Sequence, residues 1–337
     1  MRKAILLLSL QVLVLSVAAQ STTFRPGFIY REGTVLMLDG QPYQSVGFNC
    51  FQLSGCGHPW ELFTPTEVDS LFATLPRNML LRTWAFAGND AQTEGVVRAA
   101  ERHGLKLILA LADGRSSCGE FDGAPAGDGS GKTDAWYLEG YKVHYLDHVK
   151  STVQRFRDSE AVGMWEIINE PSVDSLDILC DFMHSMAAFI KQLDPNHLVE
   201  TGSFPAWAYG GLDGYRRLHD SPYIDVGDIH DYDYDYQMSR QIESPYFSGA
   251  QQVLASLGKA IIVGETGINS GFQEDCPTSV NRRAIDMRRK FDTYLSKGTS
   301  AVLVWNLARN ARQCGFTFDP RDHLFRTIIE YQPAVTH

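Results

Sequence analysis

The sequence lacks the features that mark metal-binding and nucleic-acid-binding proteins. Six cysteines occur among 337 residues, but no pair has Cys-x-x-Cys spacing and no histidine cluster accompanies them, which argues against a zinc site. The 30 basic residues are outnumbered by 40 acidic ones, and a net charge of −10 argues against nucleic acid or anionic membrane as the main partner. No Asn-x-Ser/Thr sequence occurs, so N-glycosylation is not expected. A neutral ligand is compatible with such a surface.

Long apolar runs are also missing, except for one at the start of the chain. Two basic residues precede an almost unbroken apolar stretch over 4–17, and small residues follow it. This layout is typical of a secretory signal peptide, which we predict to span 1–19 with cleavage after Ala19. A membrane anchor or a buried helix is the alternative, and the shortness of the run disfavours it. We therefore expect 20–337 to be a single exported, soluble and monomeric domain that binds no membrane.

The cysteines are expected to be partly oxidised if the protein is exported. Four of them lie in Gly-rich or polar segments that we interpret as loops: Cys56, Cys118, Cys276 and Cys314. Cys50 and Cys180 lie in segments that we interpret as buried. We predict the disulfides Cys56–Cys118 and Cys276–Cys314.

Short apolar runs alternate with amphipathic stretches along the rest of the chain. Eight runs have the near-continuous hydrophobicity of parallel strands that are covered on both faces: 44–49, 79–85, 105–112, 161–168, 197–202, 223–230, 259–265 and 300–306. Helical patterns lie between several of them, at 92–103, 137–158, 175–192 and 280–297. This alternation predicts an α/β fold of the (β/α)₈ TIM-barrel type. Residues 20–43 predict an N-terminal β-hairpin, and the Gly-rich segment 116–137 a loop between strand and helix.

Polar and aromatic residues gather where the predicted strands end. In a barrel of this kind the active site lies at the C-terminal ends of the strands. The residues there, in chain order, are Asn49; Arg82 and Trp84; Asp113; Asn169 and Glu170; His230, Asp231 and Tyr232; Glu265; and Trp305 and Asn306.

Two of these residues, Glu170 and Glu265, follow the fourth and seventh strands, which face each other across a barrel. Paired carboxyl groups on either side of a bond are what glycoside hydrolysis requires, because one must protonate the leaving oxygen while the other attacks the anomeric carbon. Either glutamate alone could be a rim carboxylate with a structural role. Together they predict a glycosidase.

Five motifs in register with these strand ends resemble glycoside hydrolase family 5, in the retaining clan A of barrel glycosidases. They are RTWAF (82–86), WEIINEP (165–171), HDY (230–232), GETG (264–267) and VWN (304–306). The resemblance runs from GFN (47–49) to the last strand. It implies an enzyme of double-displacement mechanism that acts on a polysaccharide and needs neither metal nor organic cofactor, and the predicted signal peptide makes it a secreted one.

The resemblance also implies roles for individual residues. Glu170 matches the general acid/base, Glu265 the nucleophile, and Asn169 the residue that binds the 2-hydroxyl group of the sugar. Arg82 matches the arginine that holds the nucleophile ionised, a role that suits a planar and permanently charged group. A purely structural ion pair is the alternative for Arg82.

Further residues match the family's substrate contacts. Tyr232 would donate to the nucleophile and His230 would lie near the acid/base, and their spacing of two places both on one face of a strand. Trp305 matches a platform for the sugar at the cleavage site. Either of the pair, His230 or Tyr232, could instead be a packed aromatic residue. Other platform candidates, each equally compatible with a core position, are Trp60, Trp84, Trp136 and Trp207.

The substrate is predicted less directly. RTWAF is common in mannan-cleaving members, whereas Asp113 stands where many members have a histidine, and GETG departs from well-known mannanases. We predict an endo-β-1,4-glycanase with mannan favoured. The alternatives are a cellulase or other β-glucanase, an exo-acting enzyme or transglycosylase and, from another class, a catalytically silent glycan-binding barrel.

The run HDYDYDYQ (230–237) has one further interpretation. Its alternating acids, Asp231, Asp233 and Asp235, could ligate calcium, but the Gly and Glu of an EF-hand loop are missing. We favour a solvated loop in which Tyr234 or Tyr236 contacts sugar.

Overall fold

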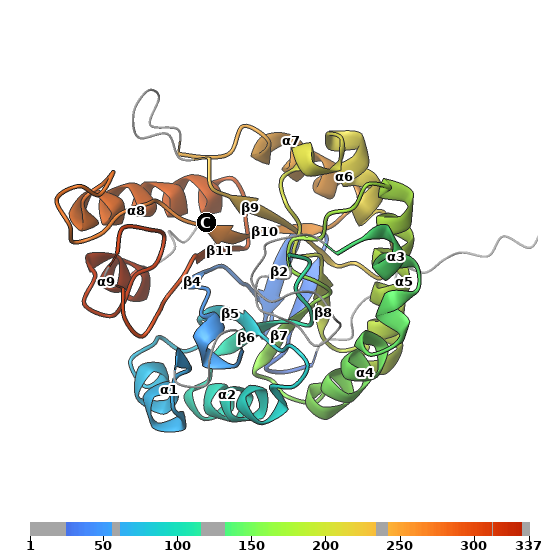
Figure 1. Cartoon of the computed structure of the whole chain (residues 1–337), viewed down its shortest axis with the longest axis horizontal. Helices are drawn as coiled ribbons and strands as arrows, with labels where there is room; N and C mark the ends of the chain where they lie inside the picture. The colour runs from blue at the N-terminus through green and yellow to red at the C-terminus, as the bar shows by residue number, and fades with distance from the viewer. Residues whose placement is uncertain (1–24, 56–60, 116–131, 234–241, 312, 332–337) are drawn as a thin grey trace, which may run out of the picture.

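Eight parallel strands form a barrel at the centre of the protein (Figure 1). The computed structural model describes residues 25–55, 61–115, 132–233, 242–311 and 313–331. The strands pair in the order β4-β11-β10-β9-β8-β7-β6-β5. Their bounds are β4 Ser45–Phe48, β5 Leu80–Trp84, β6 Lys106–Ala110, β7 Val162–Glu166, β8 Leu198–Glu200, β9 Val226–Asp231, β10 Ala260–Thr266 and β11 Ala301–Val304. The predicted (β/α)₈ barrel is confirmed, with each strand inside or within one residue of its predicted run.

A single short junction closes the barrel between β4 and β5. Asn49 and Arg82 form an isolated parallel bridge, and the backbone N–H of Cys50 donates to the carbonyl of Arg82 at 2.9 Å. Gly47 makes this approach possible, because a Cβ atom there would lie 1.8 Å from the carbonyl oxygen of Leu80. The closure brings Arg82 alongside residues from the far end of the chain.

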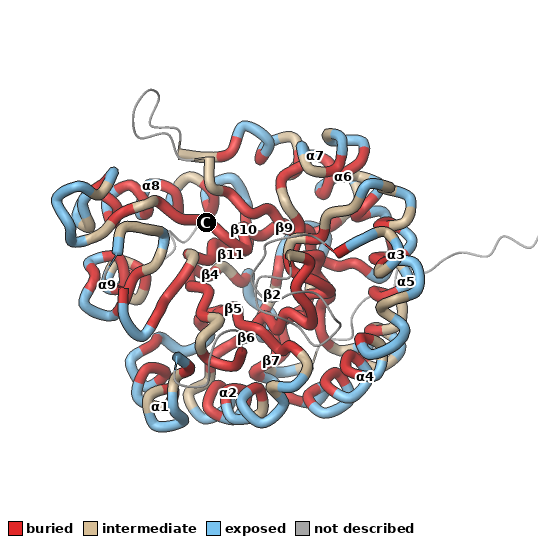
Figure 2. Tube along the Cα trace, in the orientation of Figure 1, coloured by how far each residue is buried: buried red, intermediate tan, exposed pale blue. Residues whose placement is uncertain are grey.

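Helices surround the strands and turn their apolar faces inward, as Figure 2 shows by the buried inner and exposed outer sides of the ring. Their bounds are α1 Pro65–Phe72, α2 Asp90–His103, α3 Asp134–Leu138, α4 Tyr145–Phe156, α5 Leu176–Leu193, α6 Leu212–His219, α7 Phe247–Ser256, α8 Val280–Ser296 and α9 His323–Ile329. Among the described residues, no helix combines the length and apolar character needed to cross a membrane.

Three of the four helical predictions are confirmed within two residues, and the fourth is wrong. The predicted helix over 137–158 is broken into α3, a 3-10 turn at Gly140–Lys142 and α4. Gly140 lies at the break, where glycine disfavours a continuous helix. The break lets Trp136 of α3 pack against both Tyr145 of α4 and Phe182 of α5, at centroid distances of 5.8 and 5.6 Å.

The predicted N-terminal hairpin is confirmed and has a third strand. β1 (Ile29–Glu32), β2 (Val35–Leu38) and β3 (Gln41–Pro42) form an antiparallel sheet. Its apolar residues join the first inward side chains of the barrel strands in one buried cluster. The cluster comprises Ile29, Leu36, Leu38, Tyr43, Leu80, Ile108, Met164, Leu198, Val226, Ala260, Ile262, Ala301 and Leu303. The small sheet therefore closes the N-terminal end of the barrel with apolar surface.

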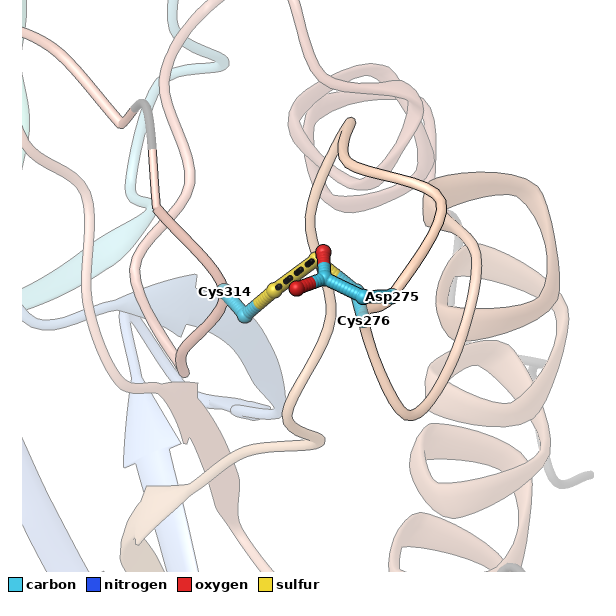
Figure 3. A group of neighbouring side chains, drawn as sticks. All are labelled: Asp275, Cys276 and Cys314. Atoms are coloured by element: carbon cyan, nitrogen blue, oxygen red, sulfur yellow. Dashed lines mark hydrogen bonds between the residues drawn. A yellow bond between two sulfur atoms is a disulfide. The ribbon is translucent and has the colours of Figure 1, made fainter.

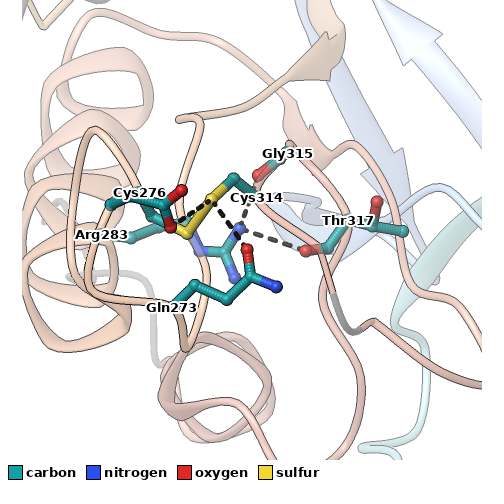
Figure 4. The surroundings of a disulfide bond; sticks show 7 residues. Gln273, Cys276, Arg283, Cys314, Gly315 and Thr317 are labelled. Atoms are coloured by element: carbon teal, nitrogen blue, oxygen red, sulfur yellow. Dashed lines mark hydrogen bonds between the residues drawn. A yellow bond between two sulfur atoms is a disulfide. The ribbon is translucent and has the colours of Figure 1, made fainter.

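A disulfide joins two loops at the opposite end. Cys276, after β10, is bonded to Cys314, after β11, which confirms one predicted pair (Figure 3). Buried Arg283 of α8 braces the same loops by donating to the carbonyls of Gly315 and Thr317, each at 3.2 Å (Figure 4).

Other predictions fall on parts of the chain that lie outside the described residues. They are the signal peptide (1–19), the pair Cys56–Cys118, Trp60, most of the loop 116–137, and Tyr234, Asp235 and Tyr236. Cys50 and Cys180 are buried free thiols, as their apolar surroundings predicted.

Candidate active site

Arg82 is the centre of the hydrogen-bond network at the strand ends. It is fully buried on β5 and binds groups from three other strands. Its Nη1 donates to Asn49 Oδ1 at 2.9 Å and to Glu265 Oε1 at 2.7 Å. Its Nη2 donates to Glu166 Oε1 at 2.6 Å and to Asn169 Oδ1 at 2.7 Å, and its Nε donates to Glu166 Oε2. Burial would lower the pKa of Arg82, but the charges of Glu166 and Glu265 raise it well above its usual value. The guanidinium is therefore a permanent cation between two carboxylates.

Glu265, on β10, receives one hydrogen bond on each oxygen. Arg82 binds Oε1, and the hydroxyl of Tyr232 donates to Oε2 at 2.8 Å. Burial raises the pKa of Glu265 to about 7, although His230 and Arg82 act in the opposite direction. The negative charge of Glu170 raises this pKa further, so protonation of Glu170 favours the ionised form of Glu265. Burial and the neighbouring Glu170 thus act against the ionised form of Glu265, while His230, Arg82 and Tyr232 act for it.

Glu170 lies across from Glu265 and is partly exposed. His230 Nδ1 is 2.9 Å from Glu170 Oε1 and 3.6 Å from Glu265 Oε2. One oxygen of Glu170 lies within 4.8 Å of one oxygen of Glu265. The backbone of Glu170 has φ of +45°, a conformation that non-glycine residues seldom adopt, and its N–H donates to the carbonyl of Gly202 at 2.8 Å. This turn directs the carboxyl group away from the strand and over the end of the barrel.

His230 is held on both sides by carboxyl groups. Its Nε2 lies 3.2 Å from Asp228 Oδ2, and its Nδ1 faces Glu170. Burial would lower the pKa of His230, but Glu265 and Asp228 raise it well above its usual value. His230 is therefore positively charged beside the two glutamates.

Asn169 and Asp113 form a rigid pair beside Arg82. The amide oxygen of Asn169 accepts from Arg82, so its Nδ2 group donates to Asp113 Oδ1 at 2.9 Å. The backbones of the same two residues form a parallel bridge. Asp113 thus occupies a position in which it orients the amide of Asn169.

Two groups of aromatic side chains lie at strand ends near the carboxyl pair. Trp305, which follows β11, stacks with Phe51 at 6.0 Å, and the Trp305–Asn306 peptide bond is cis. Phe204, which follows β8, contacts His230 edge-on at 6.5 Å and pairs with Trp207, which is 56% exposed. In the strand order, β11 is the neighbour of β10 and β8 the neighbour of β7.

The remaining tryptophan candidates occupy interior positions. Trp84 lies on β5 rather than in a loop and is only 3% exposed. It stacks on Phe86 at 5.1 Å, and the Arg82 guanidinium lies over its ring at 4.6 Å. Trp84 is therefore placed to support the Arg82 side chain. Trp136 packs between helices, as described above.

The structure brings all eight predicted site residues to one end of the barrel, and it adds three acids that were not predicted. Glu166, Glu200 and Asp228 are fully buried inside β7, β8 and β9. A signal for them was present in the sequence, because each is a carboxyl group within a run that is otherwise mostly apolar. An acid in a buried strand requires a partner or a proton.

Among the residues that the structure describes, two groups of side chains lie close enough to share a cation. Glu170, His230 and Glu265 form one, but both oxygens of Glu265 already accept hydrogen bonds from Arg82 and Tyr232. Asp275, Cys276 and Cys314 form the other, where the disulfide removes the thiolates that would bind metal. In the suggested calcium run, Asp231 accepts from Lys290 and Tyr294 of α8, which accounts for its charge.

Comparison with known families agrees with this geometry. Residues 129–283 match the family model described as GH family 5 beta-mannosidase-like. This segment of the chain is therefore similar to glycoside hydrolase family 5. The matched segment contains Glu170, which follows β7, Tyr232, which follows β9, and the strands that carry His230 and Glu265.

The chain is also similar to curated fungal proteins that are named mannan endo-1,4-beta-mannosidase. It is 27% identical to mannan endo-1,4-beta-mannosidase F of Aspergillus fumigatus over 86% of this chain and 74% of that protein. It is equally similar to mannan endo-1,4-beta-mannosidase F of Aspergillus clavatus, over 88% and 74%. Relatives from Aspergillus flavus and Aspergillus oryzae are matched over 66% of their length and one from Neosartorya fischeri over 54%, so the chain spans two thirds or less of those proteins.

Solved structures share the fold at lower identity. The endo-1,4-beta-mannanase from Rhizomucor miehei has a TM-score of 0.65 at 19% identity, over 90% of this chain and 97% of that one. The endo-beta-1,4-mannanase from Thermotoga petrophila has a TM-score of 0.66 at 19% identity, over 87% and 77%. These likenesses establish the barrel and leave the substrate to be argued from the site.

Proposed function

We propose that this chain is a retaining endo-β-1,4-mannanase in which Glu265 is the nucleophile and Glu170 the general acid/base. The observation that carries the proposal is the short distance between the two carboxyl groups, whose nearest oxygens lie within 4.8 Å. Retaining glycosidases hold this pair at about 5–5.5 Å, whereas inverting enzymes leave about 6.5–9.5 Å for a water molecule.

The contacts assign a different task to each carboxyl group. Glu265 is bound by Arg82 and Tyr232, which stabilise its ionised form and aim it as a nucleophile. It attacks the anomeric carbon while the bond to the leaving oxygen breaks, and Glu170 transfers its proton to that oxygen. The product is a glycosyl ester on Glu265.

The second step reverses the role of Glu170. Now ionised, it removes a proton from a water molecule, which attacks the anomeric carbon and releases Glu265 as a carboxylate. His230, 2.9 Å from Glu170, is positively charged and stabilises this ionised state. Two inversions retain the configuration of the sugar.

Mannan is favoured as substrate because the fungal relatives bear the name mannan endo-1,4-beta-mannosidase. Internal cleavage is favoured because aromatic side chains follow the strands next to both carboxyl-bearing strands, with Trp305 after β11 and Trp207 after β8. A β-1,4-glucan is the second candidate, since the endoglucanase Cel5A of Pseudomonas stutzeri has the same fold at a TM-score of 0.56.

We further propose that the enzyme is exported and works as a monomer without a metal or organic cofactor. The layout of 1–19 and the disulfide Cys276–Cys314 support export, because disulfides persist in oxidising compartments. Secretion with loss of 1–19 can be checked by N-terminal sequencing of the exported protein, and the monomer by light scattering.

The deciding experiment is digestion of mannan, glucomannan, carboxymethylcellulose and β-1,3-glucan, with product lengths resolved by chromatography. We expect mannan to be cleaved fastest, to a mixture of oligosaccharides, with the anomeric configuration of the first products retained in NMR spectra. Release of mannose alone would contradict internal cleavage, and products of inverted configuration would contradict the role of Glu265.

A leaving group that needs no proton tests the role of Glu170. Glu170→Ala should lose most activity on mannan yet still form the glycosyl-enzyme from a dinitrophenyl mannoside, seen as a burst of dinitrophenol. Glu265→Ala should show no burst. A burst of equal size in both variants would overturn the assignment.

A further inference from the structure

A group of buried acids lies beneath the two catalytic carboxyl groups. Glu166, Glu200 and Asp228 are fully buried, and each follows by two residues an apolar side chain of the cluster at the N-terminal end (Met164, Leu198 and Val226). Alternate residues of a strand face the same side, so the acids point into the barrel. Barrel interiors are usually filled by branched apolar residues at this level.

Two of the three acids have donors that account for a negative charge. Glu166 accepts from Arg82 on both oxygens. Asp228 Oδ1 accepts from the backbone N–H groups of Ile229 and Gly264, each at 2.6 Å, and Oδ2 lies 3.2 Å from His230 Nε2. Glu166 is therefore satisfied on both oxygens, whereas Asp228 is satisfied on Oδ1 and has the charged His230 as the neighbour of Oδ2, which forms no hydrogen bond among the described residues.

Glu200 is different. Its Oε2 accepts from the backbone N–H of Gly202 at 2.6 Å, but its Oε1 has no donor among the described residues. Glu200 faces Glu166 across the β7–β8 pairing, so two fully buried carboxyl groups are neighbours, and Glu166 raises the pKa of Glu200. Two neighbouring carboxylates repel each other and cannot form a hydrogen bond, because neither has a hydrogen to donate. One of the two must carry a proton.

The surroundings decide which one carries it. Glu166 is bound on both oxygens by a permanent cation, so it stays ionised. Burial, together with the charges of Glu166 and Asp228, raises the pKa of Glu200 well above its usual value.

We propose that Glu200 is a positioning residue: it is protonated, donates its hydrogen to Glu166, and thereby keeps Arg82 shared between Glu166 and the nucleophile Glu265. The hydrogen bond withdraws charge from Glu166, and more of the positive field of Arg82 then acts on Glu265. The effect on catalysis rests on the function proposed above, whereas the location of the proton does not.

The proposal predicts opposite behaviour for two substitutions of Glu200. Glu200→Gln keeps a neutral donor to Glu166, so the acid limb of the kcat/KM–pH profile should stay in place. Glu200→Leu keeps the volume but removes the donor. Arg82 is then drawn towards Glu166, the pKa of Glu265 rises, and the acid limb should move to higher pH by about one unit, or tenfold in proton concentration. The comparison requires that the other charged or titratable groups facing these carboxyl groups stay unchanged. They are Arg82, Glu170, Asp228, His230 and Tyr232.

The proton itself can be observed without catalysis. An infrared difference spectrum of wild type minus Glu200→Gln, at a pH two units above the Glu265 pKa of about 7, should contain the carbonyl stretch of a protonated carboxylic acid. Absence of that band overturns the proposal, whether or not the protein hydrolyses mannan. An acid limb shifted equally in the Gln and Leu variants overturns the positioning role. If the Leu variant does not fold, the Gln profile and the infrared band decide.

Discussion

The two ends of the barrel are built from the same eight strands but hold opposite kinds of side chain. At the N-terminal end, a three-stranded sheet covers an apolar cluster that includes Leu80 and Leu198. Two residues further along the same strands are Arg82 and Glu200, and both are fully buried. Arg82 is charged, and Glu200 is the acid that we propose to be protonated. The apolar end contributes stability through burial. The charged end contributes little to stability, because the desolvation of buried ions offsets their attraction. We therefore attribute its residues to catalysis.

The largest effect should come from removing the nucleophile at the charged end. Glu265→Ala should lower kcat on mannan at least about 10³-fold, because no other group can form the glycosyl ester. The free energy of unfolding should change by no more than about 1 kcal/mol, since Arg82 keeps Glu166 as partner. Reducing-sugar assays and urea denaturation measure the two quantities. Turnover within tenfold of wild type would contradict the assignment.

The reverse result is expected at the apolar end. Leu198→Ala removes a fully buried side chain and should cost about 2–5 kcal/mol of unfolding free energy, with kcat/KM unchanged while the protein is folded. Val35→Ala, at a 43% exposed position of the small sheet, is the matched control and should change stability by less than about 0.5 kcal/mol. A loss of kcat/KM in folded Leu198→Ala would break the contrast between the ends.

A subtler test concerns the pKa of the nucleophile. The Tyr232 hydroxyl stabilises ionised Glu265, so Tyr232→Phe should raise that pKa above its value of about 7. Less Glu265 is then ionised at a given acidic pH, and the acid limb of kcat/KM should move to higher pH by about one unit. Tyr331→Phe, which loses a hydroxyl bonded to Asp292 on the outer helices, should leave the profile unchanged. An unmoved or downward-shifted limb in Tyr232→Phe would count against the contact.

The smallest effect is expected at the aromatic surface beside Glu170. Trp207→Ala should raise KM for mannan several-fold with little change in kcat, since one stacking contact is worth about 1 kcal/mol. Tyr223→Ala, 39% exposed and located before β9 at the other end of the barrel, serves as control. Equal KM values for the two variants would remove Trp207 from the substrate path.

Some of this site could be predicted because parallel barrel strands end at one place. Glu170 and Glu265 follow apolar runs, and any pair of residues so placed in a (β/α)₈ barrel must lie at the same end. Glu166, Glu200 and Asp228 were missed for a related reason. In a run covered on both faces, hydrophobicity does not distinguish inward from outward positions, so an acid within it has no visible partner.

The helix pattern failed where packing between distant segments decided the outcome. The amphipathic stretch 137–158 satisfies helical periodicity, yet the chain breaks at Gly140 so that Trp136 can reach Phe182. Local periodicity contains no information about a partner on another helix.

The sequence by itself determined the alternation of strands and helices, the barrel and the two carboxyl groups at its end, because these depend on periodicity and chain order. Only the tertiary structure decided how the charges are shared. The ion pair of Arg82 with Glu265, the contact of His230 with Glu170, and the pairing of Glu166 with Glu200 each join different strands. Burial determines their strength, and burial is a property of the assembled barrel.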